Sequence, residues 1–158
     1  MMSNYYDNGF IELPFAFCVT FLTQESYCTP LILLFEMNRN ITVEEVSHRC
    51  CTQKNWMDSA VVAACPFLHY LQYLTYEGLG ERDKQLHALA VLECYIHDIR
   101  NTFNIYHQET ALTLLGHCYE MERDYNLALD YYRHSLRCLG TNNAANWHVR
   151  RMRRLISG

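Results

Sequence analysis

The clearest alternation of hydrophobic and polar positions lies between residues 109 and 140. Apolar or small residues fall at i, i+3, i+4 and i+7 on two consecutive segments, which is the spacing of one face of an α-helix. They are Leu112, Leu115, Gly116 and Tyr119 on the first segment and Ala128, Tyr132 and Ser135 on the second. The pattern predicts two antiparallel helices, 109–121 and 125–139, joined by a short polar turn and ended by Gly140.

A second pair of helices is predicted between residues 66 and 101. The face of the first helix comprises Phe67, Tyr70, Leu71 and Leu74, and that of the second comprises Leu86, Leu89, Ala90 and Cys94, widened by Leu92, Tyr95 and Ile96. Gly78 and Gly80 predict the turn between the two helices, the second of which is expected over 82–101. An earlier helix, capped by Asn55 and running through "WMDSAVVAAC", is broken or kinked by Pro66.

The first 55 residues carry weaker patterns. The segment Leu13–Leu22 fits either a buried helix or a strand. Pro30 followed by "LILLFEM" predicts a helix, because proline is tolerated in a first helical turn. The sequence "TVEE" from Thr42 has the form of a capping box and predicts a short helix through Arg49.

These elements predict an all-α fold of stacked antiparallel helical hairpins. No strand and no Gly-rich phosphate-binding loop is expected to interrupt their order. We expect an N-terminal segment, 1–55, that is mainly helical, followed by a helical domain, 56–158. A last helix, 143–156, would cap the stack and cover the open face of the hairpin before it. Its covering residues would be Trp147, Val149, Met152 and Leu155.

Charge and composition narrow the class of protein. The chain has 158 residues and a formal charge of −4, which argues against a protein that binds nucleic acid. Positive charge gathers near the end of the sequence, at Arg150, Arg151, Arg153 and Arg154. This basic surface would contact nucleic acid, anionic lipid or an acidic partner, although a solvated helix face is the favoured interpretation.

The eight cysteines show no C-x-x-C spacing, and most of them lie in apolar runs. Free cysteine in such runs packs as a small hydrophobic residue, and we expect Cys118 and Cys138 in the core. We therefore expect a reducing, cytoplasmic location, with no metal site and no cofactor. No apolar run reaches the length of a membrane span, and no Lys or Arg precedes Arg39 to form the basic region of a secretory signal.

The hairpin 109–140 resembles the tetratricopeptide repeat, whose pattern joins a Leu-Gly pair and an aromatic residue to small and large positions on the second helix. The matching residues are Leu115, Gly116, Tyr119, Tyr125, Ala128, Tyr132 and Ser135. The sequence departs from the pattern at Arg123, where glycine is usual, at Ser135, where alanine is usual, and at Gly140, where proline is usual. The resemblance implies an α-solenoid fragment, with a degenerate repeat at 66–101 before the clearer one.

A tetratricopeptide hairpin binds a peptide or helix through the groove face of its first helix. The resemblance places that face at Thr110, Thr113, His117, Glu120 and Met121. The alternative is a solvated face or a contact within the molecule, and it is favoured. The basic clamp that some repeats use for a peptide carboxylate is missing, since Thr113 and His117 occupy its positions. The expected function is a protein-binding or scaffold module rather than an enzyme.

A weaker resemblance covers most of the chain. The runs "FLTQESYCTP", "WMDSAVVAACPFLHYLQYLTYEGLG" and "TNNAANWHVRRMRRL" are similar to the C-terminal helical portion of invertebrate proteins related to cyclic GMP–AMP synthase-like nucleotidyltransferases. The Gly-Ser turn and the metal-binding carboxylates of the catalytic domain are missing. This resemblance implies an alternative function, that of a truncated, non-catalytic tail in innate nucleotide signalling.

Overall fold

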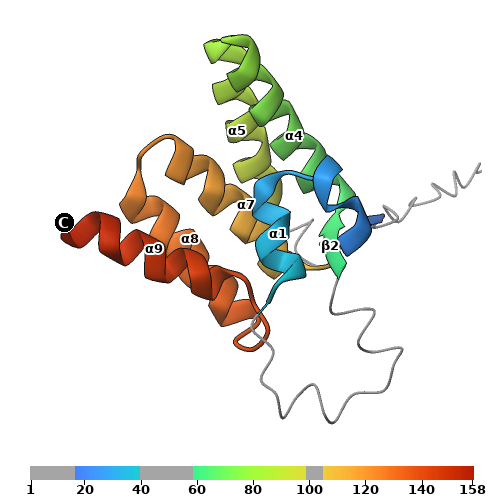
Figure 1. Cartoon of the computed structure of the whole chain (residues 1–158). Helices are drawn as coiled ribbons and strands as arrows, with labels where there is room; N and C mark the ends of the chain where they lie inside the picture. The colour runs from blue at the N-terminus through green and yellow to red at the C-terminus, as the bar shows by residue number, and fades with distance from the viewer. Residues whose placement is uncertain (1–16, 40–58, 99–104) are drawn as a thin grey trace, which may run out of the picture.

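The computed structural model describes residues 17–39, 59–98 and 105–158, and these residues are mostly helical. Figure 1 shows helical hairpins and a C-terminal helix, with a short N-terminal helix and a small sheet packed against them. The expected all-α class is confirmed, with that sheet as an addition. The predicted helix after Thr42 falls outside the described residues.

The first hairpin consists of α4 (Ala64–Leu79) and α5 (Arg82–His97). Gly80 ends α4 in the left-handed region, with φ of 72°, a conformation that costs glycine little. Pro66 lies in the first turn of α4, where its missing N–H does no harm, so it begins a helix rather than kinking one. The expectation that α5 continues to residue 101 was wrong, since it ends at His97.

The face that α5 turns to the core differs from the predicted one. The buried residues are Gln85, Ala88, Leu89, Leu92 and Ile96, while Leu86, Ala90 and Cys94 are exposed. Two overlapping apolar stripes run along this helix, and packing against α4 and α7 selects the stripe that includes Leu92 and Ile96. The periodicity alone did not distinguish them.

The second hairpin, α7 (Gln108–Met121) and α8 (Tyr125–Cys138), lies within a residue or so of its predicted bounds. Asp124 caps α8 by accepting a hydrogen bond from the Leu127 N–H at 3.1 Å. Arg123 occupies the turn with φ of 63°, which explains why glycine would suit this position better.

Helix α9 (Ala145–Ser157) covers α8, as a capping helix was expected to do. A second core forms between the two helices from Ala128, Leu129, Tyr132, Ala145, Val149 and Met152. Two of the predicted covering residues do not take part: Trp147 and Leu155 are exposed. His148 is buried instead.

The segment Leu13–Leu22 was left open as a helix or a strand, and its residues 18–22 form a strand, although a sheet was not predicted. Strand β1 (Cys18–Leu22) pairs in antiparallel fashion with β2 (Ser59–Ala63), with Cys18 opposite Ala63. The helix expected over "WMDSAVVAAC" is therefore wrong at residues 59–63. A short buried run rich in valine suits a strand as well as a helix, and pairing with β1 decides the outcome.

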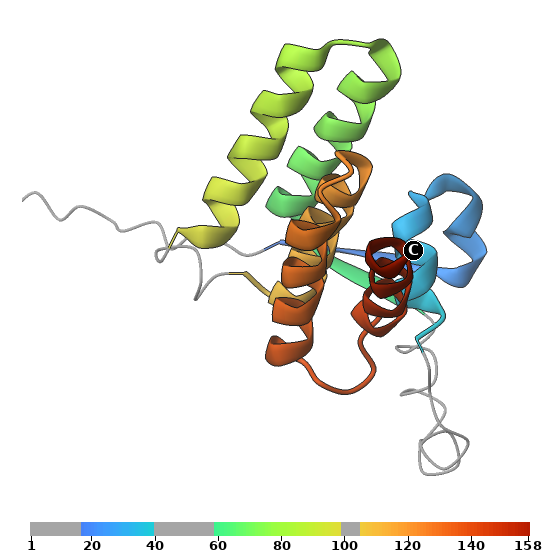
Figure 2. The same cartoon turned by 90° about the vertical axis from the view of Figure 1, so that its left-hand side faces the viewer.

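The described N-terminal residues are integrated with the rest of the chain. After β1 come a 3₁₀ helix, η1 (Thr23–Cys28), and α1 (Leu31–Met37), which begins after Pro30 as predicted. Ile32 and Leu33 of α1 belong to the same core as Leu112 and Leu115 of α7. The expected division near residue 55 thus does not separate two packing units. Figure 2 shows α1 beside α9 at one side of the molecule.

Gly116 of α7 lies against the ring of Tyr132 on α8. A Cβ atom at this position would lie 2.9 Å from Cε1 of the buried Tyr132 ring. We expect Gly116→Ala to lower the free energy of unfolding by about 1–2 kcal/mol, because overpacking outweighs the gain in helix propensity. Gly78→Ala is the matched control: nothing lies within 4 Å of its added Cβ, so it should stabilise the protein by roughly 0.5–1 kcal/mol. Urea unfolding measures both variants, and the same sign of change in both would contradict the close approach.

Candidate functional site

The expected groove face of α7 lies largely inside the molecule. Thr110 and Thr113 are 3% and 0% exposed, because α7 is covered by α1, α4, α5, α8 and β2. These two residues therefore do not line an open groove. The resemblance placed the groove on a helix that, in this fold, is the central one.

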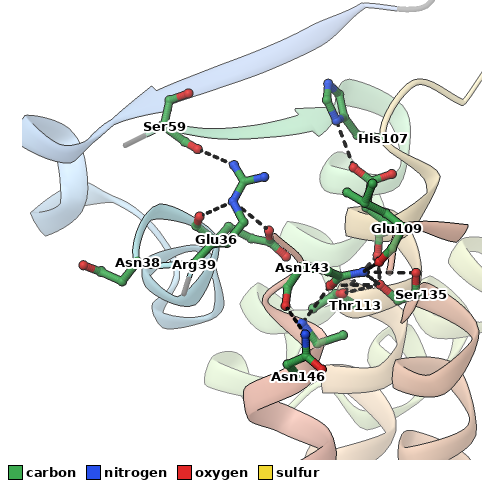
Figure 3. Close-up of polar contacts among 12 residues, drawn as sticks. Glu36, Asn38, Arg39, Ser59, His107, Glu109, Thr113, Ser135, Asn143 and Asn146 are labelled. Carbon is green, nitrogen blue, oxygen red and sulfur yellow. Dashed lines mark hydrogen bonds and ion pairs between the residues drawn. The ribbon is translucent and has the colours of Figure 1, made fainter. Parts of the chain in front are cut away.

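A buried polar network explains the small polar residues of the hairpin (Figure 3). The hydroxyls of Thr113 and Ser135 both donate to the Glu109 carbonyl, at 2.9 and 2.7 Å. The Asn143 amide donates to the Ser135 and Leu139 carbonyls at 3.0 and 2.9 Å, and its oxygen accepts from the Ala145 N–H at 2.8 Å. This network fixes the connection between α8 and α9.

The other three predicted groove residues are partly buried and make internal contacts. His117 Nδ1 is hydrogen-bonded to the Tyr70 hydroxyl at 2.9 Å, and burial lowers the His117 pKa. Glu120 accepts from the Tyr132 hydroxyl at 2.9 Å and from Arg151 at 2.6 Å. Met121 packs against the main core. Each side chain thus has a structural partner.

A second polar cluster joins α1 to the start of β2 (Figure 3). Arg39 donates to the Glu36 carbonyl at 2.6 Å and to the Ser59 carbonyl at 2.8 Å. The Glu36 carboxylate is fully buried, and burial raises its pKa to about 7 against the opposing charge of Arg39. Burial also acts to raise the pKa of Glu109, but the hydrogen bond with His107, a backbone hydrogen bond and the charges of His107 and Arg39 together outweigh it, and that pKa is lowered.

An open groove lies between α1 and α9. Two adjoining cavities of about 250 and 290 Å³ share Phe35 and Trp147 as walls. The larger cavity is apolar and is completed by Leu31, Leu34 and Asn38, which recur with Phe35 at i, i+3, i+4 and i+7 along α1. Leu31 is 66% exposed and Trp147 is 41% exposed. A continuous apolar stripe of α1 is therefore left open to water. We call this feature the α1–α9 groove.

The basic surface predicted at the C-terminus divides into three parts. Arg150 and Arg154 line the smaller cavity of the groove, and within the described parts of the chain neither side chain forms an ion pair. Arg151 also lines that cavity but is paired with Glu120. Arg153 is exposed and does not line either cavity. The four arginines do not form one uniform patch.

His148 forms the floor of the smaller cavity. Its ring stacks on Tyr132 with centroids 4.7 Å apart and meets the edge of Phe35 at the same distance. Burial, with the nearby charge of Arg151, lowers its pKa to about 3, so the imidazole is neutral near pH 7. Arg151 donates to Nδ1 at 3.2 Å, and because arginine has no acceptor, the single ring proton must be on Nε2.

Two of these buried donors lack an acceptor. His148 Nε2 and Arg151 Nε are inaccessible to water and have no hydrogen-bond partner among the described residues. Most buried polar groups in proteins are hydrogen-bonded, so each exception needs an explanation.

The sequence analysis did not single out His148 or the apolar stripe of α1. The signal was present in the spacing of Leu31, Leu34 and Phe35, which places a second apolar face on a short helix.

Other chemical features are sparse in the described ranges. No group of three or more His, Cys, Asp or Glu residues is placed to hold a metal ion within 17–39, 59–98 and 105–158. Cys118 is buried as predicted, but Cys138 is exposed, so its expected place in the core was wrong. None of the helices in the described parts is long and apolar enough to cross a membrane.

The chain was compared with family models, curated proteins and solved structures. No family model, no curated protein and no solved structure matches the chain.

Proposed function

We propose that the chain is a protein-binding module that takes an apolar segment of a partner protein in the α1–α9 groove. The observation that carries this proposal is the stripe of exposed Leu31 and half-buried Leu34 and Phe35, which lines one cavity with the exposed Trp147. Apolar side chains that are aligned along a helix and left open are typical of surfaces that accept a peptide or a helix. The scaffold contributes rigidity, because α1 is anchored to the main core through Ile32 and Leu33.

The tetratricopeptide resemblance is part of this proposal. It is supported by the close packing of Gly116 on Tyr132 and by the buried small residues Ala128 and Ser135. Here the hairpin acts as the scaffold, and the partner contacts the neighbouring α1–α9 groove instead of α7. A cytoplasmic location is also proposed, and it is supported by the six free cysteines among the described residues.

Peptide display against the purified protein tests the proposed function. Peptides that the wild-type protein selects should bind the variant Leu31→Asp at least about tenfold more weakly, because a carboxylate would then stand on the apolar wall. Leu79→Asp is the matched control, since Leu79 on α4 is also 66% exposed but lies outside the groove. Fluorescence anisotropy of labelled peptides gives the dissociation constants. Equal weakening by both substitutions, or by neither, would remove the groove as the binding surface.

A further inference from the structure

Strand β1 has one edge that faces away from β2. The Ala64 N–H donates to the Phe17 carbonyl at 2.8 Å, and the ladder continues from this pair into β1 and β2. Hydrogen-bonded and non-hydrogen-bonded pairs alternate along an antiparallel ladder, so Val19 and Phe21 bond to β2 as well. The residues of β1 whose N–H and C=O groups point away from β2 are therefore Cys18, Thr20 and Leu22.

Two hydrogen bonds at the margins of the sheet agree with this alternation. The outward Leu22 N–H donates to the Glu25 carboxylate at 2.8 Å. Ser59, which lies opposite Leu22, turns its carbonyl to the other margin, where it accepts from Arg39 at 2.8 Å (Figure 3). Along the rest of the outer β1 edge, no residue in the described ranges forms a hydrogen bond with the outward backbone groups.

The sequence of β1 lacks the features that protect an exposed strand edge. Proteins guard such edges with charged side chains or proline, because unpaired backbone groups are a template for another strand. The strand "CVTFL" has neither, and its β-branched and aromatic residues favour extended backbone. Apolar surface is exposed at its two ends, with Phe17 at 71% and Leu22 at 48%. This edge is therefore suited to pair with an additional strand.

A second copy of β1 fits this edge. When two antiparallel copies cross at Thr20, Thr20 lies opposite Thr20 of the other copy, and Cys18 lies opposite Leu22. Every outward-facing residue then meets an outward-facing residue, so N–H groups face C=O groups. This contact brings no charged side chains of the strands together, whereas the net charge of −4 on each copy disfavours contact through more charged surfaces.

A strand from another protein fits this edge less well. Strands that add to the edge of a sheet gain specificity from pockets for their alternate side chains. The cavities of the α1–α9 groove include no residue of β1, so they offer such a strand no pocket. The occupant whose chemistry matches the edge is a second copy of this chain.

We infer that two copies of this chain pair through β1 in antiparallel fashion and join their two-stranded sheets into one sheet with two-fold symmetry. The Cys18 N–H of one copy donates to the Leu22 carbonyl of the other, even while the Leu22 N–H stays on Glu25. Because one strand pair buries less area than a standard interface, we expect a reversible, concentration-dependent dimer. This surface is separate from the proposed peptide groove, since β1 lines neither of its cavities.

Opposite charges placed at the two-fold axis test this inference. Thr20→Lys alone and Thr20→Glu alone should each weaken self-association about fivefold or more, because like charges opposite each other destabilise a strand pair. An equimolar mixture of the two variants should regain the dimer, since lysine then faces glutamate. Sedimentation velocity over a range of protein concentrations gives the dissociation constants, and far-UV circular dichroism checks that each variant is folded.

Two further comparisons support the charge test. The same two substitutions at Thr75, an exposed threonine on α4, change the net charge equally and should leave self-association unchanged. Thr20→Pro removes an outward N–H that the pairing with β2 does not use, so the strand should tolerate it. It should weaken the dimer about tenfold or more, because each copy loses a hydrogen bond and gains a steric clash.

Each other outcome would overturn the inference. A wild-type protein that stays monomeric up to its solubility limit has no pairing edge of this kind. A dimer that survives Thr20→Pro and both charge variants is formed by another surface, and one that only Leu31→Asp dissociates is formed by the α1–α9 groove. Loss of the dimer in both charge variants without recovery in their mixture would exclude the crossing at Thr20.

Discussion

Replacing Asn143 by alanine should lower the free energy of unfolding by about 2–4 kcal/mol. The Asn143 amide is buried and links three parts of the chain: the Ser135 and Leu139 carbonyls at the end of α8 and the Ala145 N–H at the start of α9. Alanine leaves the Leu139 carbonyl and the Ala145 N–H without these partners and takes one of two hydrogen bonds from the Ser135 carbonyl, which the Leu139 N–H also contacts at 3.0 Å. It also removes the side-chain acceptor of the Ala145 N–H in the first turn of α9. Urea unfolding followed by circular dichroism measures the change.

Asn146→Ala provides the control for this substitution. Asn146 is the same residue type, three positions along, but it is exposed, and its amide makes one long hydrogen bond of 3.3 Å to the Asn143 carbonyl. We expect a change of no more than about 0.5 kcal/mol. A similar loss of stability in the two variants would show that the connection between α8 and α9 is not held by the buried amide.

Glu36→Gln should change how stability depends on pH. Burial raises the pKa of the Glu36 carboxyl from 4.5 to about 7, with the charge of Arg39 opposing that rise. Between those values the folded protein keeps its proton while the unfolded chain loses it, so this group destabilises the fold as pH rises from about 4.5 to about 7. The gap between the two pKa values corresponds to about 3 kcal/mol. Glutamine, which does not ionise, removes this loss.

The difference in the free energy of unfolding between the wild-type protein and Glu36→Gln, followed against pH, isolates the contribution of the Glu36 carboxyl. His117 and His148 have lowered pKa values, so they act in the opposite sense: they lower the free energy of unfolding as pH falls below about 6.5. Both proteins share that effect, and it cancels. The variant should therefore equal the wild-type protein near pH 4 and exceed it by up to about 3 kcal/mol near pH 8, in urea unfolding at each pH. Glu77→Gln, at an exposed carboxylate on α4, should follow the wild-type profile. Parallel profiles for Glu36→Gln and the wild-type protein would contradict the raised pKa of this buried carboxyl.

The long helices could be predicted because their hydrophobic periodicity agrees with the capping and turn residues at their ends. The hairpin α7–α8 was placed within about a residue, since Asp124 caps α8 and the turn has no competing pattern. The strand β2 was not predicted, because a buried run of alanine and valine has no period and only its pairing with β1 makes it a strand. The predicted core face of α5 was wrong for a related reason. Two apolar stripes overlap on this helix, and packing against the neighbouring helices determines which of them is buried.

Most of the candidate site could not be predicted from the sequence. The groove forms because α1 lies beside α9, although the two helices are more than a hundred residues apart in sequence. No local sequence pattern predicts that they are neighbours in space. The sequence singled out Arg150 and Arg154 together with Arg151 and Arg153, and the division between them follows from which ones line the cavity. The residues of α7 were misplaced because a resemblance gives the usual open face of a hairpin, whereas here α1 and β2 cover it.

The pairing of β1 with β2 has a consequence for synthesis of the chain on the ribosome. Each helical hairpin joins neighbouring segments, so it can form soon after it emerges. Residues 18–37 emerge earlier, yet their partners in β2 and α7 are made much later. The edge of β1 therefore stays uncovered until β2 has been made, and Ile32 and Leu33 until α7 has been made. The segments that cover residues 18–37 are made after them, and during this interval an unpaired strand edge and apolar side chains are open to aggregation.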